Sequence, residues 1–470
     1  MRISDLTGRE VGLLGFGREG RATHDALRAA GHQATLHAFA DRAIAVPEGV
    51  HLHVGEEGAA TAMRALDVLV RSPGFAPHHP LRRAADAARI VQTTATNLFL
   101  SEARWAGWPV IGVTGSKGKS TTSTLAHLAL QEAGIASELV GNVGVAALER
   151  LDRFRREKLV AVLEMSSYQC ADLEDGGGPS VACLLDLFPE HMDWHGGVDG
   201  YYAAKARIGL SQCETDALRY NTRALDALAP AIGARLRARP AAFVQAVNTP
   251  PGLHYEGGWF MRGAERLVSD ERMVLAGAHN RENAVAALAA TELLGVRAEH
   301  LERVLASFRG LPYRLQDEGV HGGIRWINDS LSTAPEVVAV ALRALGRAVS
   351  TVIAGGQDRG YDPGVLVEQL RAAPVATLIV LPDTGAALAR QVRACGLGLV
   401  VREAANLDEA VALAVACSPA GTTCLFSPGA PSYNAYASFE ERGRHFRRLV
   451  EAVGRGGRHG ADSAPRAGRD

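Results

Sequence analysis

The 470-residue sequence contains no apolar run long enough to cross a membrane, and Met1–Asp5 carries charge where a signal peptide would be apolar. It has no excess of either charge, because 50 Lys and Arg residues stand against 51 Asp and Glu residues. Such a chain lacks the basic field that attracts nucleic acid or an anionic membrane surface. We therefore expect a cytoplasmic protein that binds no nucleic acid and does not insert into membranes.

Cysteine is scarce: the 6 cysteines lie far apart and form no Cys-x-x-Cys pair. This spacing excludes a zinc ribbon and a disulfide scaffold, and it indicates free thiols in a reducing compartment. The hydrophobic share of 47% and the charged share of 21% are those of a globular chain and exclude a disordered or coiled-coil protein. At about 150 residues per domain, the length suggests about three domains.

Glycine, by contrast, is abundant, with 51 residues, and many of them directly follow short apolar runs. Glycines in that position are typical of strand-to-helix turns, so the pattern predicts an α/β fold. This succession of strand, glycine turn and helix begins anew three times along the chain, which predicts three domains. They are a Rossmann-like domain over residues 1–97, a central domain with a phosphate-binding loop over 98–310, and a second Rossmann-like domain over 311–454. Residues 455–470 are rich in Gly, Arg and Ala without periodicity, and we expect a disordered tail there.

The strongest chemical signal is the loop Gly115-Ser-Lys-Gly-Lys-Ser120, which lies between an expected strand at 108–113 and an expected helix. Backbone N–H groups at a helix N-terminus cradle phosphates, while Lys119 would neutralise phosphate oxygens and Ser120 would ligate Mg²⁺. The match to the usual phosphate-binding motif falls one position short, because its leading glycine would stand at Val113. The alternative is a glycine turn with a surface lysine.

A second glycine loop, Gly15-Phe-Gly17-Arg-Glu-Gly20, follows an expected strand at 11–14 and fits the dinucleotide-binding pattern. An NAD site also needs an acid at the end of the next strand, and the stretch Ala34–Phe39 has none. The loop therefore favours a diphosphate group over NAD, and it argues against an NAD-dependent dehydrogenase. A tight turn without any ligand is the alternative.

Polar residues also follow two further expected strands. Glu164 follows the strand at 159–163, and His191 lies beyond the next strand. Ligands of parallel sheets bind where strands end, and carboxylate and imidazole groups in an ATP site suit Mg²⁺. His191 and His195 have the spacing of a zinc pair, but Met192 stands where a metalloprotease carries glutamate, so zinc is not expected.

An ordered series of motifs resembles the Mur ligases and spans about residues 8–450. The series consists of Thr114–Ser120, Glu164–Gln169, Glu190–Asp193, Ala204–Arg207, His279–Asn283, Gly310–Arg314, Asn328–Ser330 and Ser427–Gly429. The resemblance implies a three-domain, ATP-dependent ligase that forms an amide through an acyl phosphate in peptidoglycan precursor synthesis. Within the family, the motifs are most similar to those of the members that add glutamate to UDP-N-acetylmuramoyl-L-alanine.

The resemblance also implies roles for individual residues. ATP would be held by Gly115, Ser116, Lys117, Gly118, Lys119, Ser120, Thr121, Asn280, Asn283, Arg314 and Asp329. Two Mg²⁺ ions would be held by Ser120, Glu164, His191 and a carbamylated Lys205, and the last three would be catalytic together with Lys119. The UDP-sugar substrate would be bound by Gly17, Arg18, Glu19, Ser72, Asn142 and Ser166. Glutamate would be bound by Thr333, Arg359, Ser432 and Phe439.

The expected amino-acid site departs from that of the D-glutamate enzymes. Leu331 stands where they typically carry a lysine, and Arg359 replaces another lysine. Four segments are instead similar to a variant that adds L-glutamate and relies on a separate epimerase, namely residues 17–21, 188–195, 356–360 and 427–432. We therefore expect an L-glutamate-adding monomer. The alternatives are D-glutamate as the acceptor, another Mur or folylpolyglutamate-type ligase, and a nucleotide-binding module without catalysis.

Overall fold

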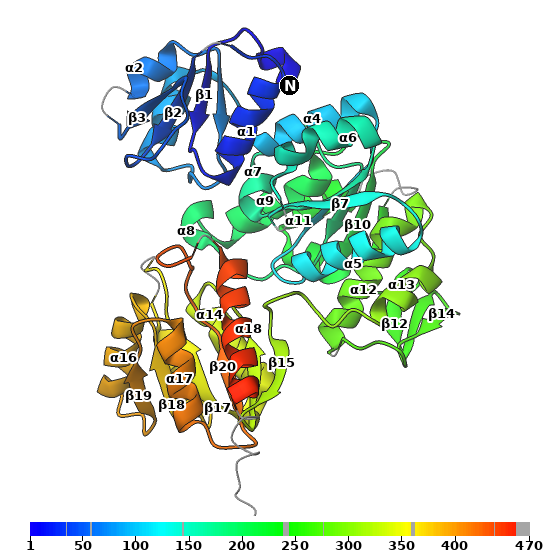
Figure 1. The fold of residues 1–470 in the computed structure, drawn as a ribbon. Coiled ribbons are helices and arrows are strands. Elements are labelled where there is room, and N and C mark those ends of the chain that lie inside the picture. The colour runs from blue at the N-terminus through cyan, green and yellow to red at the C-terminus, as the bar shows by residue number, and fades with distance from the viewer. Residues whose placement is uncertain are drawn as a thin grey trace, which may run out of the picture. The chain divides into compact units, whose positions relative to one another are not determined.

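Figure 1 shows the chain as a computed structural model, which describes residues 1–33, 35–56, 59–142, 145–237, 244–275, 277–358, 362–436 and 438–456. The chain forms two compact units, Met1–Arg309 and Gly310–Asp470. Two sheets lie in the first unit and one lies in the second, and helices pack on their faces. The expected α/β fold is therefore confirmed, and it contains three sheets, whereas the predicted domain boundaries at 97/98 and 310/311 stay predictions.

The first sheet places the glycine loop after its central strand. Its strands are all parallel and lie in the Rossmann-like order β3-β2-β1-β4-β5. Helix α1 packs on one face and helices α2 and α3 pack on the other, which buries every residue of β1. The elements are η1 (Ile3–Leu6), β1 (Val11–Leu14), α1 (Arg18–Ala29), β2 (Leu36–Ala40), β3 (Val50–Val54), α2 (Ala59–Arg64), β4 (Val68–Arg71), α3 (Pro80–Ala88) and β5 (Val91–Thr93).

The second sheet is nine-stranded, in the order β14-β13-β12-β11-β10-β9-β6-β8-β7, and carries the phosphate loop after its strand β6. Only the pairs β12–β13 and β13–β14 are antiparallel. The strands are β6 (Val110–Thr114), β7 (Ser137–Gly141), β8 (Val160–Glu164), β9 (Val181–Leu184), β10 (Ala217–Asn221), β11 (Val244–Val247), β12 (Leu253–Glu256), β13 (Trp259–Arg262) and β14 (Glu265–Ser269).

The helices around this second sheet include α5 and α12, which pack against each other beside the phosphate loop (Figure 1). They are α4 (Ala95–Ala106), α5 (Lys119–Glu132), η2 (Ala147–Arg150), α6 (Leu151–Glu157), α7 (Ser167–Ala171), α8 (Met192–His195), α9 (Val198–Leu210), α10 (Thr222–Ala227), α11 (Pro230–Arg237), α12 (Ala278–Thr291), η4 (Glu292–Leu294) and α13 (Ala298–Leu305).

The third sheet, in the second unit, has the order β15-β16-β20-β17-β18-β19, so its last strand in sequence lies between β16 and β17. Only β15 runs antiparallel to its neighbour. Helices α14, α15 and α16 pack on one face, and α17 and α18 pack on the other. The elements are β15 (Gln316–His321), β16 (Ile324–Asn328), α14 (Pro335–Leu345), η5 (Gly346–Ala348), β17 (Val349–Ala354), α15 (Gly364–Ala372), β18 (Thr377–Val380), α16 (Thr384–Ala394), β19 (Val400–Glu403), α17 (Leu407–Cys417), β20 (Thr423–Phe426) and α18 (Phe439–Gly456).

Two element boundaries differ from the expectation for local reasons. The helix expected from about residue 98 begins at Ala95, because the Thr94 hydroxyl caps it by accepting a first-turn N–H at 3.1 Å. Helix α18 continues to Gly456, and residues 457–470 of the tail expected at 455–470 lie outside the described residues. Among the helices of the described residues, none is both long and apolar enough to span a membrane.

A buried ion-pair cluster ties the end of β4 to the segment after α7 within the first unit. The Asp172 side chain is only 5% exposed and accepts hydrogen bonds from Arg71 at 2.6 and 3.0 Å and from Arg82 at 3.3 Å. The Asn97 amide donates to the backbone carbonyl of Asp172 at 2.7 Å. Because Arg71 directly precedes Ser72, this carboxylate fixes the segment that adjoins the first glycine loop.

We expect Asp172→Ala to lower the unfolding free energy of the first unit by about 3 kcal/mol, because it leaves two largely buried arginines without their acid. Asp175→Ala is the matched control: Asp175 is 87% exposed and pairs with Arg207, so its loss should cost at most about 1 kcal/mol. Urea unfolding curves of both variants measure the difference. Equal midpoints would contradict the importance of the Asp172 cluster.

Candidate active site

The loop Gly115–Ser120 joins β6 to α5, and its glycines are required by close neighbours. A Cβ on Gly115 would lie 2.6 Å from the Cβ of Leu185, and a Cβ on Gly118 would lie 2.3 Å from Oδ1 of Asn283. Gly118, with φ of 84°, is the N-cap of α5 and carries no side chain that could cover the first N–H groups of the helix. The loop therefore presents the backbone geometry that binds phosphate.

The two lysines of this loop have different contacts. The Nζ atom of Lys119 donates to the carbonyls of Gly115 and Ser116, both at 2.8 Å, and Lys117 pairs with Glu190. Ser120 and Thr121 follow Lys119 in the first turn of α5. The fold thus brings the expected phosphate-binding residues of the loop together, with an ammonium group held against the loop.

Helix α12 brings two further expected ATP residues to the same place. Asn280 and Asn283 are buried, and the amide of Asn283 donates to Oδ1 of Asn280 at 3.3 Å. The Thr122 hydroxyl of α5 donates to Oδ1 of Asn283 at 3.4 Å. Asn283 is therefore in contact with both the phosphate loop and the helix that follows it, although 161 residues separate it from Thr122.

Glu164 ends β8 beside this loop and is 1% exposed. Its Oε1 atom accepts a hydrogen bond from the side-chain amide of Asn142 at 2.8 Å, which brings an expected substrate residue to an expected metal ligand. Among the described residues, its Oε2 atom has no hydrogen-bond partner. A buried carboxylate oxygen without a partner is unfavourable on its own, and it fits a site completed by a cation.

Lys205, on α9, is also 1% exposed, and its Nζ donates to the hydroxyl of Thr114 at 3.1 Å. Burial, together with the nearby charge of Lys119, lowers the pKa of Lys205 to about 7. The Tyr201 ring lies beneath the amine, with 5.4 Å between Nζ and the ring centroid. A substantial share of these amines is therefore neutral near pH 7. Nothing in the local sequence marks Lys205 as buried, and its contacts with Thr114 and Tyr201 could not be predicted from the sequence.

His191 lies in the same region, whereas His195 has a different contact. His191 is the N-cap of α8, and desolvation lowers its pKa, with further lowering from Lys205 and Lys119. His195 forms a hydrogen bond with the Ser167 hydroxyl at 2.9 Å through Nε2, and burial lowers its pKa to about 4. The described residues hold no cluster of three or more His, Cys, Asp or Glu side chains suited to a metal.

The first glycine loop packs against Ser72, which is expected to bind the UDP-sugar together with this loop. A Cβ on Gly15 would lie 2.9 Å from the Cβ of Ser72, and a Cβ on Gly20 would lie 2.3 Å from the Gly15 carbonyl. Gly17 is the N-cap of α1, and a Cβ there would meet no heavy atom within 4 Å. These are the tight turn, open approach and close packing of a phosphate-binding glycine loop.

The expectation that no acid follows the second strand is wrong in one respect. Strand β2 continues to Ala40, one residue beyond the stretch considered, and Asp41 comes directly after it. Asp41 pairs with His79 at 3.2 Å and is 61% exposed. An acid therefore does stand where a ribose-binding carboxylate would lie, and the sequence pattern missed it because the strand end was placed too early.

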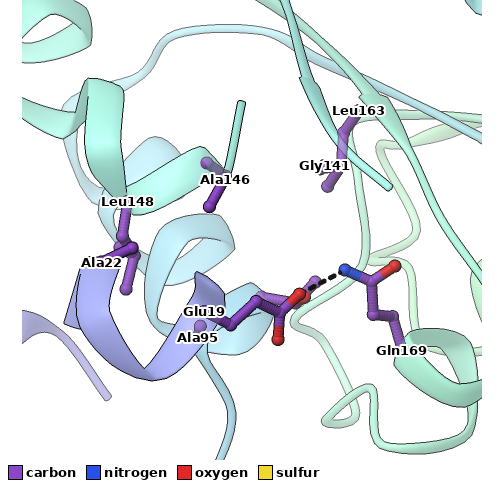
Figure 2. Close-up of a pocket in the computed structure, with 10 residues that line it drawn as sticks. Glu19, Ala22, Ala95, Gly141, Ala146, Leu148, Leu163 and Gln169 are labelled. Carbon is purple, nitrogen blue, oxygen red and sulfur yellow. Dashed lines mark hydrogen bonds between the residues drawn. The ribbon is translucent and has the colours of Figure 1, made fainter. Parts of the chain in front are cut away.

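Glu19 and Gln169 meet beside a small cavity, as Figure 2 shows. The Gln169 amide donates to Oε1 of Glu19 at 2.8 Å, and Oε2 has no partner among the described residues. Burial raises the pKa of Glu19. Arg18 donates to the Gly141 carbonyl at 2.7 Å, and Ser166 caps α7 by accepting the N–H of Gln169 at 3.2 Å. The cavity of about 10 Å³ has room for at most about one water.

In the second unit, Asp329 lies at the carboxyl end of β16 and is 2% exposed. It accepts hydrogen bonds from the Ser427 hydroxyl at 2.6 Å and from the backbone N–H of Leu315 at 3.1 Å. Burial raises its pKa to about 6, although these hydrogen bonds and the charge of Arg314 oppose the rise. Arg314 itself is exposed.

The other expected residues of the second unit have different surroundings. Ser432 is 2% exposed, Thr333 is exposed, and the Phe439 carbonyl accepts a hydrogen bond from the Ser330 hydroxyl at 2.9 Å. Arg359 lies outside the described residues. The roles predicted for this group in glutamate binding stay predictions.

Comparisons with known proteins place the chain in a family. Residues 113–238 match the family described as the Mur ligase middle domain. A protein of Xanthomonas axonopodis pv. citri named UDP-N-acetylmuramoyl-L-alanine--L-glutamate ligase is 37% identical over 464 residues, which cover 96% of this chain and 97% of that protein. A protein of the same name from Salinispora tropica is 36% identical over 472 residues, with 96% and 99% covered.

Solved structures agree at the level of the fold. UDP-N-acetylmuramate-alanine ligase MurC of Thermotoga maritima has a TM-score of 0.56 at 17% identity and covers 94% of this chain and 99% of its own. The MurF ligase of the same organism, in complex with ADP, has a TM-score of 0.53 at 15% identity, with 96% and 97% covered. The α/β fold, with its glycine loop between β6 and α5, is the fold of these solved ligases. The chain belongs to the Mur ligase family, and it is an ATP-dependent, ADP-forming ligase.

We expect the buried carboxyl of Asp329 to make the second unit less stable as pH rises from about 4 to about 6. The unfolded carboxyl ionises near 3.8, whereas the folded one keeps its proton to about pH 6, so the folded state binds more protons in this window. The loss amounts to at most about 3 kcal/mol and is complete above that window.

Urea unfolding at several pH values measures this slope. Asp329→Asn should flatten the slope between pH 4 and 6. Asp317→Asn is the control, because the pKa of Asp317 is lowered by its hydrogen bonds, so its removal cannot flatten a falling curve. An unchanged slope in Asp329→Asn would contradict the assignment.

Proposed function

We propose that the protein joins L-glutamate to UDP-N-acetylmuramoyl-L-alanine at the expense of ATP, in peptidoglycan precursor synthesis. The observation that carries the proposal is the name shared by relatives that are 36–37% identical over nearly their whole length. The reaction is assigned to a cytoplasmic monomer. The similarity to the L-glutamate-adding variant also implies a separate epimerase that acts after the ligation.

The first step transfers the γ-phosphoryl group of ATP to the L-alanyl carboxylate of the nucleotide sugar. A carboxylate oxygen attacks phosphorus, the bond to ADP breaks, and an acyl phosphate forms. The backbone N–H groups of the loop Gly115–Ser120 and the ammonium of Lys119 would bind the phosphate oxygens, where negative charge gathers. Support comes from the open N-terminus of α5 and from the position of the Lys119 Nζ at the loop carbonyls.

In the second step the amine of glutamate attacks the acyl carbon, and the tetrahedral intermediate expels phosphate to leave the amide. Thr333, Arg359, Ser432 and Phe439 are proposed to hold glutamate, while Arg314 and Asp329 are proposed to contact the nucleotide. Two features of the sequence favour L-glutamate over D-glutamate. Four segments are similar to those of the L-glutamate-adding variant, and Leu331 stands near the proposed glutamate site where the D-glutamate enzymes typically carry a lysine.

Two Mg²⁺ ions would be held by Ser120, Glu164, His191 and a modified Lys205. The unpartnered, buried Oε2 of Glu164 supports a cation here. When bound, Mg²⁺ neutralises the charge of the phosphate groups and orients the phosphate oxygens. Glu164 also keeps Asn142 in place through the 2.8 Å hydrogen bond, so the metal side and the sugar side of the site share one carboxylate.

Carbamylation of Lys205 would turn its side chain into an anionic ligand. A neutral amine adds CO₂, forms an N–C bond and releases one proton, and the product is a carbamate. The lowered pKa of about 7 supports this step, because it leaves much of the amine neutral and nucleophilic near pH 7. The change also removes the repulsion between Lys205 and Lys119.

The UDP-sugar is proposed to bind at the first glycine loop and Ser72. Gly17 would let a phosphate approach the backbone at the N-terminus of α1, where the helix dipole favours an anion. Arg18 and Glu19 in the first turn of α1 would then connect this site to Asn142 and Ser166. Asp41, at the end of β2, is an added candidate for the ribose or base.

Lys119→Ala should reduce turnover at least about a hundredfold, because it removes the cation that faces the developing charge. Phosphate release in the presence of ATP, Mg²⁺ and both acceptor substrates measures the effect. Lys158→Asn is the control: this lysine ends α6 with φ of 50°, which asparagine tolerates, so turnover should be unchanged. Full activity in Lys119→Ala would refute the phosphate-loop assignment.

The function itself is tested by phosphate release with each substrate omitted in turn. We expect release only when UDP-N-acetylmuramoyl-L-alanine and L-glutamate are both present, and much less release with D-glutamate. Preference for D-glutamate would overturn the L assignment. No release with either enantiomer would disprove the glutamate ligase proposal. Release with another amino acid would then indicate a related ligase, and no release with any amino acid would indicate a nucleotide-binding module without catalysis.

A further inference from the structure

Histidines gather on one face of the first sheet, outside the sites assigned above. Strands β2 and β3 pair in parallel, with His37 opposite His51 and Phe39 opposite His53. Because the side chains of a strand alternate between the two faces of its sheet, all four lie on the same face. It is the face that α2 and α3 cover, since Phe39 belongs to the core beneath these helices. Figure 1 shows β3 at the edge of the sheet, and His51 is accordingly exposed.

Two of these histidines, His37 and His53, are in direct contact, and we call them the histidine pair. Nδ1 of His37 lies 3.0 Å from Nε2 of His53, and the two rings stack with an interplanar angle of 16°. The Phe39 ring stacks on the His53 ring at a centroid distance of 4.8 Å, which restrains the orientation of that imidazole. Both histidines are half-buried. The fold therefore holds two ring nitrogens side by side at one point of the sheet face.

The histidine pair is neutral near pH 7. Burial lowers the pKa of His37, and repulsion from His51 lowers it further, whereas Glu10 acts in the opposite direction. Burial also lowers the pKa of His53, with further lowering from the other two histidines. Neutral imidazole is the form that binds a metal ion, so protons compete little for these nitrogens at that pH.

Glu10 faces the second ring nitrogen of His37. Its Oε2 atom lies 4.0 Å from Nε2 of that ring. A metal on Nδ1 needs the ring proton on Nε2, and a carboxylate near Nε2 favours that tautomer. Histidines that bind metals direct their second N–H to a carboxylate in the same way. The position of Glu10 therefore suits His37 as a ligand through Nδ1.

The distance between the two nitrogens favours particular metals. Bonds of about 2.0–2.1 Å from one ion to two nitrogens 3.0 Å apart enclose an angle of about 90–100°. A tetrahedral zinc site would hold the same two nitrogens about 3.3–3.4 Å apart. Square-planar and tetragonal sites, with angles of about 90°, are those of Cu²⁺ and Ni²⁺. The spacing therefore fits these two ions better than Zn²⁺.

We propose that the histidine pair binds a divalent transition-metal ion, Ni²⁺ or Cu²⁺ in preference to Zn²⁺, through Nδ1 of His37 and Nε2 of His53. The described residues hold no group of three or more side chains suited to a metal, so water fills the remaining positions. The ion replaces the hydrogen bond between the rings, and no net proton leaves, because each neutral ring keeps one N–H. Bound metal joins β2 to β3 and stabilises the first unit by mass action. The proposal does not rest on the proposed function.

Calorimetric titration of the full chain with NiCl₂, without nucleotide or substrates, tests the site. The protein carries no histidine tag, and excess Mg²⁺ competes for the oxygen ligands around Glu164. Ni²⁺ is the probe because Cu²⁺ oxidises exposed thiols such as that of Cys395. We expect a saturable site that binds Zn²⁺ more weakly than Ni²⁺. His37→Gln and His53→Gln should each weaken Ni²⁺ binding about tenfold or more, because each removes one of the two protein ligands.

His78→Gln is the matched control, because His78 is exposed in the same unit and belongs to no strand of the sheet. It should bind Ni²⁺ as the unchanged protein does. Melting temperatures separate a lost ligand from a lost fold. Glutamine keeps a hydrogen-bonding side chain at each position, so the variants should melt normally without metal. Added Ni²⁺ should raise the melting temperature of the unchanged protein and of His78→Gln, but not that of His53→Gln.

Three results would overturn the proposal. They are the absence of a saturable Ni²⁺ site, normal Ni²⁺ binding in both His37→Gln and His53→Gln, and an equal loss of binding in His78→Gln. Zn²⁺ binding tighter than Ni²⁺ binding would overturn the assignment of the metal. None of these results bears on the ligase proposal, because no substrate takes part in the measurement.

Discussion

The close approach of α12 to the phosphate loop is the constraint on which the nucleotide side of the first unit depends. It is made possible by the missing side chain of Gly118 and by the small, fully buried alanines of α12, such as Ala286, Ala287 and Ala290. Small residues let helix backbones pack tightly, and tight packing leaves no room for alternative loop conformations. Asn283 then joins the loop, α5 and α12 through its side chain.

Several charged groups of the molecule are buried without full compensation, and they gather where polar ligands are expected. Among the described residues, Glu164 has an unpartnered oxygen, and Asp329 is buried without a cation at hydrogen-bond distance. Burial and the charge of Lys119 act on the amine of Lys205 more strongly than the nearby acids Glu190 and Glu164 do. Each arrangement lowers stability in the free protein. Such groups are aligned before the substrates arrive, so less reorganisation is needed during the reaction.

Much of the fold could be predicted because glycine turns and apolar strands are local signals. The strand expected at 11–14 and the phosphate loop stand where the pattern put them. Contacts between distant segments could not be predicted in this way. Asp41 was missed through a strand end misplaced by one residue, and the burial of Arg442 was missed because an arginine on an amphipathic helix carries no local sign of burial. Lys205 was singled out only by resemblance, since its burial arises from tertiary packing.

The central position of β20 has a consequence for how the chain is made. Its partners are made earlier, because β16 begins at residue 324 and β17 at residue 349, whereas β20 begins at residue 423. Until residues 423–426 emerge, both strands keep an unpaired edge, and α18 has no completed sheet to cover. The second unit therefore cannot form cooperatively during synthesis, and a transcript cut short before this strand would yield a product prone to aggregation.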